Sequence, residues 1–141
     1  MSESNVELHR RANEAFNTRD VEAYIMYCDP QIELHSAVTG PGRAVYFGHD
    51  GVREWHRQFD DAFGEEIRVE PEVYFDLGEH TISYHSLLGR GQQSGADVRT
   101  QAADLCRWQD GLIVYRKGYV HREGVFRDLG VSEDALEPIK P

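Results

Sequence analysis

The spacing of hydrophobic residues changes near Glu66, and this change constrains the fold more than any other feature of the chain. Before Glu66, apolar residues recur every three or four positions, as on helices that lie against a core. After it, apolar and polar residues alternate, which is typical of strands. The alternation covers residues 68–75, 81–89, 99–108 and 112–121, and a shorter stretch at 31–36 lies among the helices. Helices followed by an antiparallel sheet predict the α+β class, with the helices packed on one face of the sheet.

Capping signals predict three helices before that change. Ser4 and Glu7 form a capping box at the start of the first helix. Asp20 is placed to cap a second, which ends before Pro30 because the residue preceding a proline is pushed out of the α region. Asp50 is placed to cap a third. The apolar face of this third helix carries Val52, Trp55, Phe59 and Phe63.

Size and charge predict one globular domain. The 141 residues form a single domain, with a core of about residues 4–130 and a short C-terminal tail. The net charge of −10 opposes contact with a phosphate backbone, so we expect no nucleic-acid partner. The polar start and the lack of an apolar run of about 20 residues predict neither a signal peptide nor a membrane span.

Cysteine and histidine spacing predicts no metal site. Cys28 and Cys106 are isolated and lack CxxC spacing, so we expect buried thiols in a reducing compartment and a cytoplasmic protein. His80, His85 and His121 fall on strands without the spacing of metal ligands.

The last hairpin decides which side chains face the helices. If Asp110-Gly111 is a two-residue turn, Gln109 pairs with Leu112 and the register follows. In that register Leu105 lies opposite Arg116, and both point toward the helices. Ala103 and Gly118 share their face, whereas Trp108, Tyr115, Tyr119 and the pair Asp104–Lys117 share the other. A bulge would exchange the faces, because side chains alternate along a strand.

Polar residues that interrupt the apolar faces are the candidate functional groups. A buried Arg116 needs a carboxylate, backbone carbonyls or an anionic ligand, unless it extends to the rim or pairs with a structural carboxylate. His56 lies on the apolar face of the third helix, as a hydrogen-bonded core residue or a ligand contact. His35 is out of phase with its strand and is expected to point outward. Asp104 becomes an acid or base candidate if the register slips. The predicted pocket has walls from Tyr24, Trp55, Phe59 and Leu105, with His56 and Arg116 as its main polar groups.

The order of these elements resembles the nuclear transport factor 2-like superfamily, and within it the SnoaL-like domains. The likeness rests on two helices, a strand and the helix at Asp50–Phe59, followed by strands that end with Asp110–Val114. It implies a cone-shaped fold, with three N-terminal helices over a strongly curved antiparallel or mixed sheet and a pocket at one end. It also implies homodimers that pair through the outer sheet face and, in the enzymes, acid–base chemistry without a cofactor.

The catalytic groups of the resembled enzymes are missing at the matching positions. Polyketide cyclases and limonene epoxide hydrolases carry an aspartate where this chain has Gly118. Ketosteroid isomerases carry one near Ser36 or Ala37, and an oxyanion tyrosine near Ala12. None of these activities therefore transfers residue by residue.

Three functions stay open on the sequence. The first is binding of a small apolar metabolite, or one that bears a carboxylate or carbonyl group, without established catalysis. The second is a cofactor-independent lyase, isomerase or hydrolase of the polyketide cyclase, epoxide hydrolase or ketosteroid isomerase type. The third is a non-catalytic dimerisation module. A buried carboxylate or histidine with a shifted pKa inside the cone would favour an enzyme.

Overall fold

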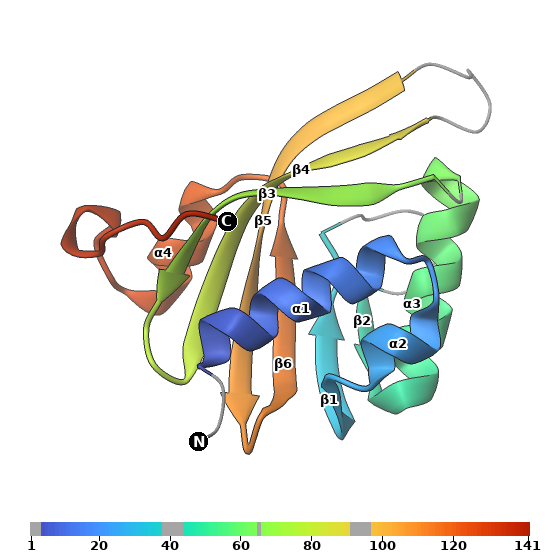
Figure 1. Ribbon diagram of the computed structural model, residues 1–141, viewed down its shortest axis with the longest axis horizontal. Coiled ribbons are helices and arrows are strands. Elements are labelled where there is room, and N and C mark those ends of the chain that lie inside the picture. Colours follow the sequence, from blue (N-terminus) through green and yellow to red (C-terminus); the bar gives the residue numbers. More distant parts are fainter. Residues whose placement is uncertain (1–3, 38–43, 65, 91–96) are drawn as a thin grey trace.

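The computed structural model describes residues 4–37, 44–64, 66–90 and 97–141. Helices α1 (Asn5–Asn17) and α2 (Val21–Ile25) lead into strands β1 (Cys28–His35) and β2 (Val45–Phe47) and helix α3 (Gly48–Phe63). Strands β3 (Arg68–Asp76), β4 (His80–Arg90), β5 (Asp97–Gln109) and β6 (Leu112–Tyr119) follow, and then helix α4 (Glu123–Leu129) and a 3-10 turn (Glu133–Ala135). The predicted α+β class is confirmed (Figure 1).

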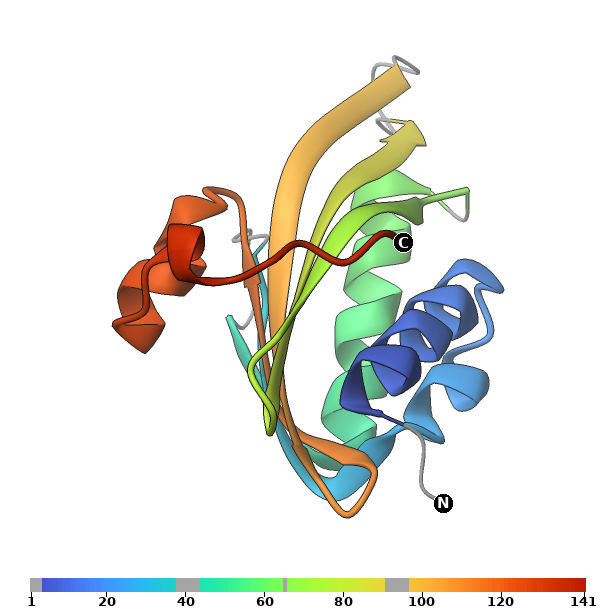
Figure 2. The same cartoon turned by 60° about the vertical axis from the view of Figure 1, so that its left-hand side comes forward.

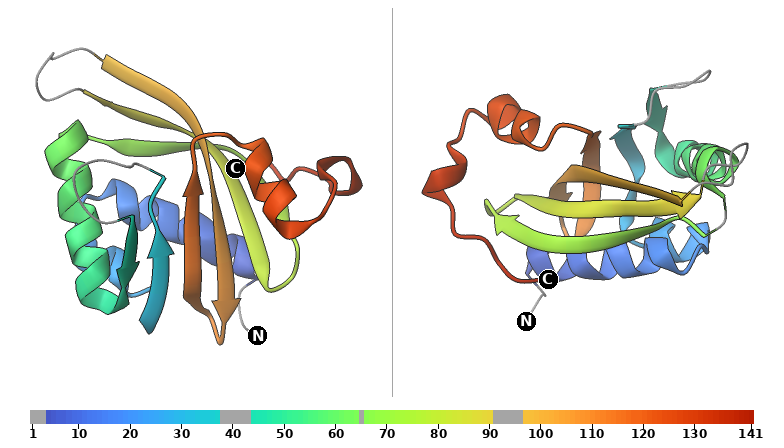
Figure 3. Two further views of the ribbon diagram at one scale, coloured as in Figure 1. Left: turned by 180° about the vertical axis from the view of Figure 1, so that it is seen from behind. Right: turned by 90° about the horizontal axis from the view of Figure 1, so that it is seen from above.

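The six strands form one mixed sheet in the order β2-β1-β6-β5-β4-β3. Strands β1 and β6 pair in parallel, and the remaining neighbours pair antiparallel. Helices α1, α2 and α3 lie on one face of the sheet, which we call the inner face, and α4 lies on the outer face (Figures 2 and 3). Buried apolar residues therefore form two clusters, one between the helical layer and the inner face and one between the outer face and α4.

Local capping accounts for two of the helix starts. The Ser4 side chain accepts a hydrogen bond from the backbone N–H of Glu7 at 3.2 Å, and Asp20 accepts one from Glu22 at 3.0 Å. The predicted Asp50 cap is wrong, since α3 begins at Gly48 after Phe47 in the N-cap position. Asp50 instead lies in the first turn, where its carboxylate binds Arg53 at 2.7 Å. An acidic side chain in the first turn still stabilises the helix through its dipole.

A bulge in the last hairpin corrects the predicted register. Asp110 and Gly111 both have positive φ, 53° and 78°, as a two-residue hairpin turn requires, and Gln109 pairs with Leu112. Trp108 then pairs with Ile113, but Arg107 pairs with Tyr115, so Val114 is an extra residue on β6. Beyond it Cys106 lies opposite Arg116, Asp104 opposite Gly118 and Ala103 opposite Tyr119.

The bulge moves whole sets of side chains between the faces. Arg116 stays on the inner face as predicted, but its β5 neighbours there are Asp104, Cys106 and Trp108. Leu105, predicted to line the pocket, lies in the outer cluster under α4. The expectation that Asp104 and Trp108 point outward is therefore wrong.

The segment after α4 returns to the edge of the sheet. Ile139 forms two backbone hydrogen bonds with Tyr74 of β3, each 2.8 Å long, and the carbonyl of Lys140 accepts one from Arg10 of α1 at 2.7 Å. No helix in the described part of the chain combines the length and the apolar character that crossing a bilayer takes.

Candidate functional site

A group of polar side chains is buried on the inner face, in the middle of an otherwise apolar layer. Helix α1 contributes His9 and Asn13, β4 contributes Thr81, Ser83 and His85, β5 contributes Asp104 and Cys106, and β6 contributes Arg116. Each is at most 9% exposed. Buried polar groups are costly unless they are hydrogen-bonded, so their partners decide what this group can do.

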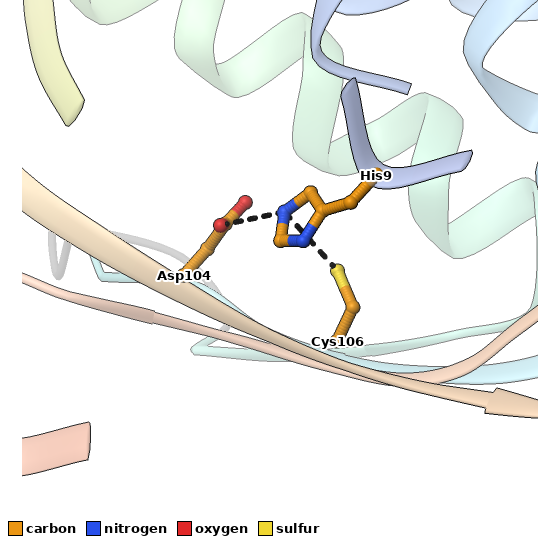
Figure 4. A group of neighbouring side chains, drawn as sticks. All are labelled: His9, Asp104 and Cys106. Carbon is orange, nitrogen blue, oxygen red and sulfur yellow. Dashed lines mark hydrogen bonds and ion pairs between the residues drawn. The ribbon is translucent and has the colours of Figure 1, made fainter. Parts of the chain in front are cut away.

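Asp104 is the centre of this group. Its Oδ1 lies 2.9 Å from Nε2 of His9, and its Oδ2 accepts a hydrogen bond from Nη2 of Arg116 at 3.1 Å. Figure 4 shows His9 reaching from α1 toward Asp104 and Cys106 of β5. Burial alone would raise the pKa of Asp104, but His9 and Arg116 outweigh it and hold the pKa well below its usual value. Asp104 is therefore an ionised carboxylate shared by two partners.

The hydrogen bonds around His9 assign its tautomer. Nδ1 of His9 lies 2.8 Å from Oγ1 of Thr81, and Nε1 of Trp108 donates to the same oxygen at 2.8 Å. Because an ionised carboxylate can only accept, Asp104 requires a proton on Nε2 of His9, and the Thr81 hydroxyl, which accepts from the Trp108 indole, can still donate its own proton to Nδ1. A neutral His9 then carries its proton on Nε2 and donates it to Asp104. Every member of this chain of hydrogen bonds is satisfied.

Arg116 is less well satisfied than Asp104. Its guanidinium lies over the ring of Trp55, 4.9 Å from the centroid, and its Nη2 binds Asp104. The Nε–H of Arg116 and the Nε1–H of Trp55 are both buried and have no acceptor among the described residues. Burial raises the pKa of the nearby Cys28 thiol to about 12 and that of Tyr24 well above its usual value, so both stay neutral. Arg116 and Trp55 thus each keep one buried donor that no described residue accepts.

A second polar contact chain connects α1 to β4. Nδ2 of Asn13 donates to the hydroxyls of Tyr74, at 2.9 Å, and Ser83, at 3.3 Å. Ser83 in turn lies 3.2 Å from Nδ1 of His85. Burial lowers the pKa of His85 to about 4, so this imidazole is neutral near pH 7.

His9, Asp104 and Cys106 also have the spacing of a metal site, since their ligand atoms lie within 4.8 Å of one another. The chemistry of the group fits a cation poorly. The guanidinium of Arg116 lies 3.1 Å from the same carboxylate, and burial raises the pKa of the Cys106 thiol well above its usual value. A metal binds the thiolate rather than the thiol, so this cluster favours a hydrogen-bond network.

Comparison with known proteins shows the family of this chain. The model of a family described as the SnoaL-like domain matches residues 9–116, which include His9, Asp104 and Arg116. The chain belongs to the SnoaL-like domain family. No curated protein matches it in sequence.

Solved structures show the fold that this SnoaL-like domain shares. An NTF2-like protein of unknown function from Burkholderia pseudomallei superposes with a TM-score of 0.74 at 18% identity, over 89% of this chain and 97% of that one. A Catenulispora acidiphila protein with a ketosteroid isomerase-like fold, in complex with trimethylamine, gives 0.72 at 16% identity, over 91% and 95%. A putative polyketide cyclase from Pseudomonas putida gives 0.70 at 14% identity, over 84% and 92%.

Gly118 explains how this SnoaL-like domain departs from the resembled enzymes. A Cβ at Gly118 would lie 2.9 Å from Cβ of Ala37 and 3.1 Å from its backbone nitrogen. Ala37 thus fills the space beside Gly118, and Ala103, predicted to share the face of Gly118, lies in the outer cluster. Asp104 is the direct cross-strand partner of Gly118. The domain therefore has an inner-face carboxylate on β5, one strand away from the β6 position matched to the family aspartate.

His56 and His35, two further predicted site residues, face carboxylates other than Asp104. Nδ1 of His56 faces Asp60 of its own helix at 3.5 Å, and burial lowers the pKa of His56. Nε2 of His35 lies 2.6 Å from Glu33, and its ring lies 5.1 Å from that of Tyr115. Trp55 lies 5.8 Å from Tyr24 and 5.1 Å from Phe59 between ring centroids, so these three predicted wall residues do form one aromatic group.

Sequence reasoning missed His9, Thr81, Ser83 and His85. The burial of His9 could have been predicted, because His9, Ala12 and Phe16 have the spacing i, i+3, i+7 and so share the buried face of α1. No sequence pattern predicted burial of the polar residues of β4. Their polar side chains alternate with apolar ones, which suggests that the polar set faces solvent, whereas both faces of β4 are covered.

Proposed function

We propose that this SnoaL-like domain binds a small, largely apolar molecule between its helices and the inner face of the sheet, in a cone-shaped site, and catalyses proton transfer on it without a cofactor. The observation that carries the proposal is the buried Asp104 carboxylate shared by His9 and Arg116. A buried carboxylate with a shifted pKa beside a histidine is typical of acid–base sites.

His9, Asp104 and Arg116 have different roles in the proposed reaction. His9 is the proton acceptor, because Asp104 holds its Nε2–H and leaves the lone pair on Nδ1. That lone pair faces the Thr81 hydroxyl, which would take a proton from the substrate as it gives its own to His9. Asp104 stabilises the imidazolium that forms. Arg116 keeps Asp104 ionised and supplies positive charge for an oxyanion such as an enolate.

The class of reaction follows from this set of groups. An imidazole, a carboxylate and a guanidinium suit abstraction of a proton next to a carbonyl group, the first step of cyclisations by carbon–carbon bond formation and of keto–enol isomerisations. The putative polyketide cyclase among the structural neighbours is consistent with such chemistry.

Deuterium exchange tests the proposal without knowledge of the substrate. The protein is incubated in D₂O with a panel of small cyclic and aromatic ketones, and loss of the α-proton signals is followed by NMR. The native protein should accelerate exchange of at least one ketone, and His9→Gln should lose most of this effect, about 10²–10⁴-fold, because an amide cannot accept the proton. His80→Gln, a change at a half-buried histidine at the start of β4, is the matched control and should exchange like the native protein. Exchange no faster than in buffer, or equally fast in His9→Gln, would contradict the proposal.

A second candidate is ligand binding without catalysis. His9 and Asp104 are only 1% and 2% exposed, and their hydrogen bonds are complete, as expected of a network that only supports a binding site. In that case a ketone would bind and shift protein resonances, but its α-protons would exchange at the buffer rate.

A further inference from the structure

Two buried N–H groups without acceptors among the described residues belong to neighbouring side chains, one on α3 and one on β6. They are Nε1–H of Trp55, whose residue is 1% exposed, and Nε–H of Arg116, whose residue is 9% exposed. The guanidinium carbon lies 4.9 Å from the centroid of the Trp55 ring, so the two side chains that carry these donors are in contact. An unpaired buried donor loses the hydrogen bonds it makes to water in the unfolded chain, and two adjacent ones are a notable concentration of that cost.

Arg116 has fewer hydrogen-bond partners among the described residues than it has donors. A guanidinium has five N–H donors, and among the described residues its side-chain hydrogen bond is the one to Asp104. That carboxylate is already shared with His9. Cys28 and Tyr24, which lie near enough to act on Arg116, remain neutral because burial raises the pKa of each. The Nε–H of Arg116 is therefore a buried donor without an acceptor among the described residues, in a layer that is otherwise largely apolar.

We propose that Nε–H of Arg116 and Nε1–H of Trp55 form a binding site for an sp² oxygen, the carbonyl or carboxylate oxygen of a small aromatic molecule. The rest of that molecule packs against the aromatic group of Tyr24, Trp55 and Phe16, whose rings lie 5.7–6.2 Å apart. The oxygen lies beside Asp104 and His9 because Arg116 contacts Asp104 directly. This site rests on the proposed function only in that a small molecule enters the interior; it does not require proton transfer.

The two tryptophans make an NMR experiment selective. The indole N–H of Trp108 already donates to Thr81, so it is an internal reference for the unpartnered N–H of Trp55. The ¹H–¹⁵N spectrum of the whole protein is recorded with acetophenone, benzoate and ethylbenzene, which share a phenyl ring and differ in the oxygen. Acetophenone or benzoate should shift the resonances of Trp55 Nε1–H and Arg116 Nε–H downfield, and ethylbenzene should not. The stronger of the two responses identifies a carbonyl or a carboxylate as the preferred source of the oxygen.

Trp55→Phe provides the matched variant, because it keeps an aromatic ring and removes the donor. It should weaken binding of the oxygen-bearing probe about tenfold and leave that of ethylbenzene unchanged. Equal weakening for all three probes would mean that Trp55 acts through packing, which overturns the proposal. So would resonances that stay fixed at millimolar acetophenone and benzoate while both N–H groups show contacts to a long-lived water. Shifts of the two N–H resonances without α-proton exchange would support this binding site and refute proton transfer. Exchange without such shifts would support proton transfer and refute this binding site.

Discussion

Acidification should destabilise the fold through His85. Burial lowers the pKa of His85 from its ordinary value of 6.5 to about 4, so the unfolded chain takes up a proton in a range where the folded protein does not. The neutral imidazole therefore contributes stability that is fully present above pH 6.5 and is lost as the pH falls toward 4.

The size of the effect follows from the pKa difference. Each unit corresponds to about 1.4 kcal/mol, so the full loss is about 3 kcal/mol, of which about 2 kcal/mol is reached at pH 5. His56 adds to this loss, because burial lowers its pKa as well. Asp104, whose pKa is depressed, adds its own loss only at more acidic pH.

Denaturant unfolding at about pH 7.5 and about pH 5 measures the effect. The native protein should lose at least about 2 kcal/mol of unfolding free energy between the two conditions, and His85→Gln should lose about 2 kcal/mol less than the native protein. Any cost of the substitution itself cancels, because each protein is compared with itself. His80→Gln is the control and should follow the native protein. If His85→Gln loses as much stability on acidification as the native protein, then His85 does not carry the pH dependence and the reasoning fails.

Three further predictions concern other parts of the molecule. Gly118→Ala should lower the unfolding free energy by about 1–3 kcal/mol, because its Cβ would lie 2.9 Å from that of Ala37, and Ala37→Gly should restore part of the loss in denaturant unfolding. Cys28 and Cys106, 2% and 1% exposed, should resist Ellman's reagent in the folded protein and react in denaturant; one thiol reacting rapidly in the folded protein would contradict their burial. The homodimer through the outer sheet face stays a prediction. It would use the partly buried Tyr115, and sedimentation of a monomer at micromolar concentration would count against it.

Elements with strong local signals could be predicted from the sequence. The Ser4 and Asp20 caps, the buried face of α3 and the Asp110-Gly111 turn depend on residues a few positions apart. Strand β2 has only three residues, too few for alternation to be recognised.

The register of β6 could not be predicted from the sequence, and the set of residues that form the site depends on that register. Leu112 to Tyr115 are all apolar, so either alternation fits this stretch and nothing local marks Val114 as the extra residue. Apolar character could not identify the inner face either, because α4 covers a second hydrophobic cluster on the outer face. Because Leu105 and Ile82 are buried there, apolar character does not identify the inner face, and the polar Asp104 and Thr81 were free to lie inside. The site depends on pairing between strands, which only tertiary structure fixes.

The backbone bridge between Ile139 and Tyr74 has a consequence for solubility. Strand β3 ends the sheet, and an uncovered terminal strand offers its free N–H and C=O groups to any other chain. The C-terminal segment occupies both backbone groups of Tyr74 and so blocks that edge near the C-terminal end of β3. Removing residues 137–141 would leave the two hydrophobic clusters intact but expose the edge of β3 to pairing with other chains. We therefore expect the truncated protein to aggregate before it unfolds.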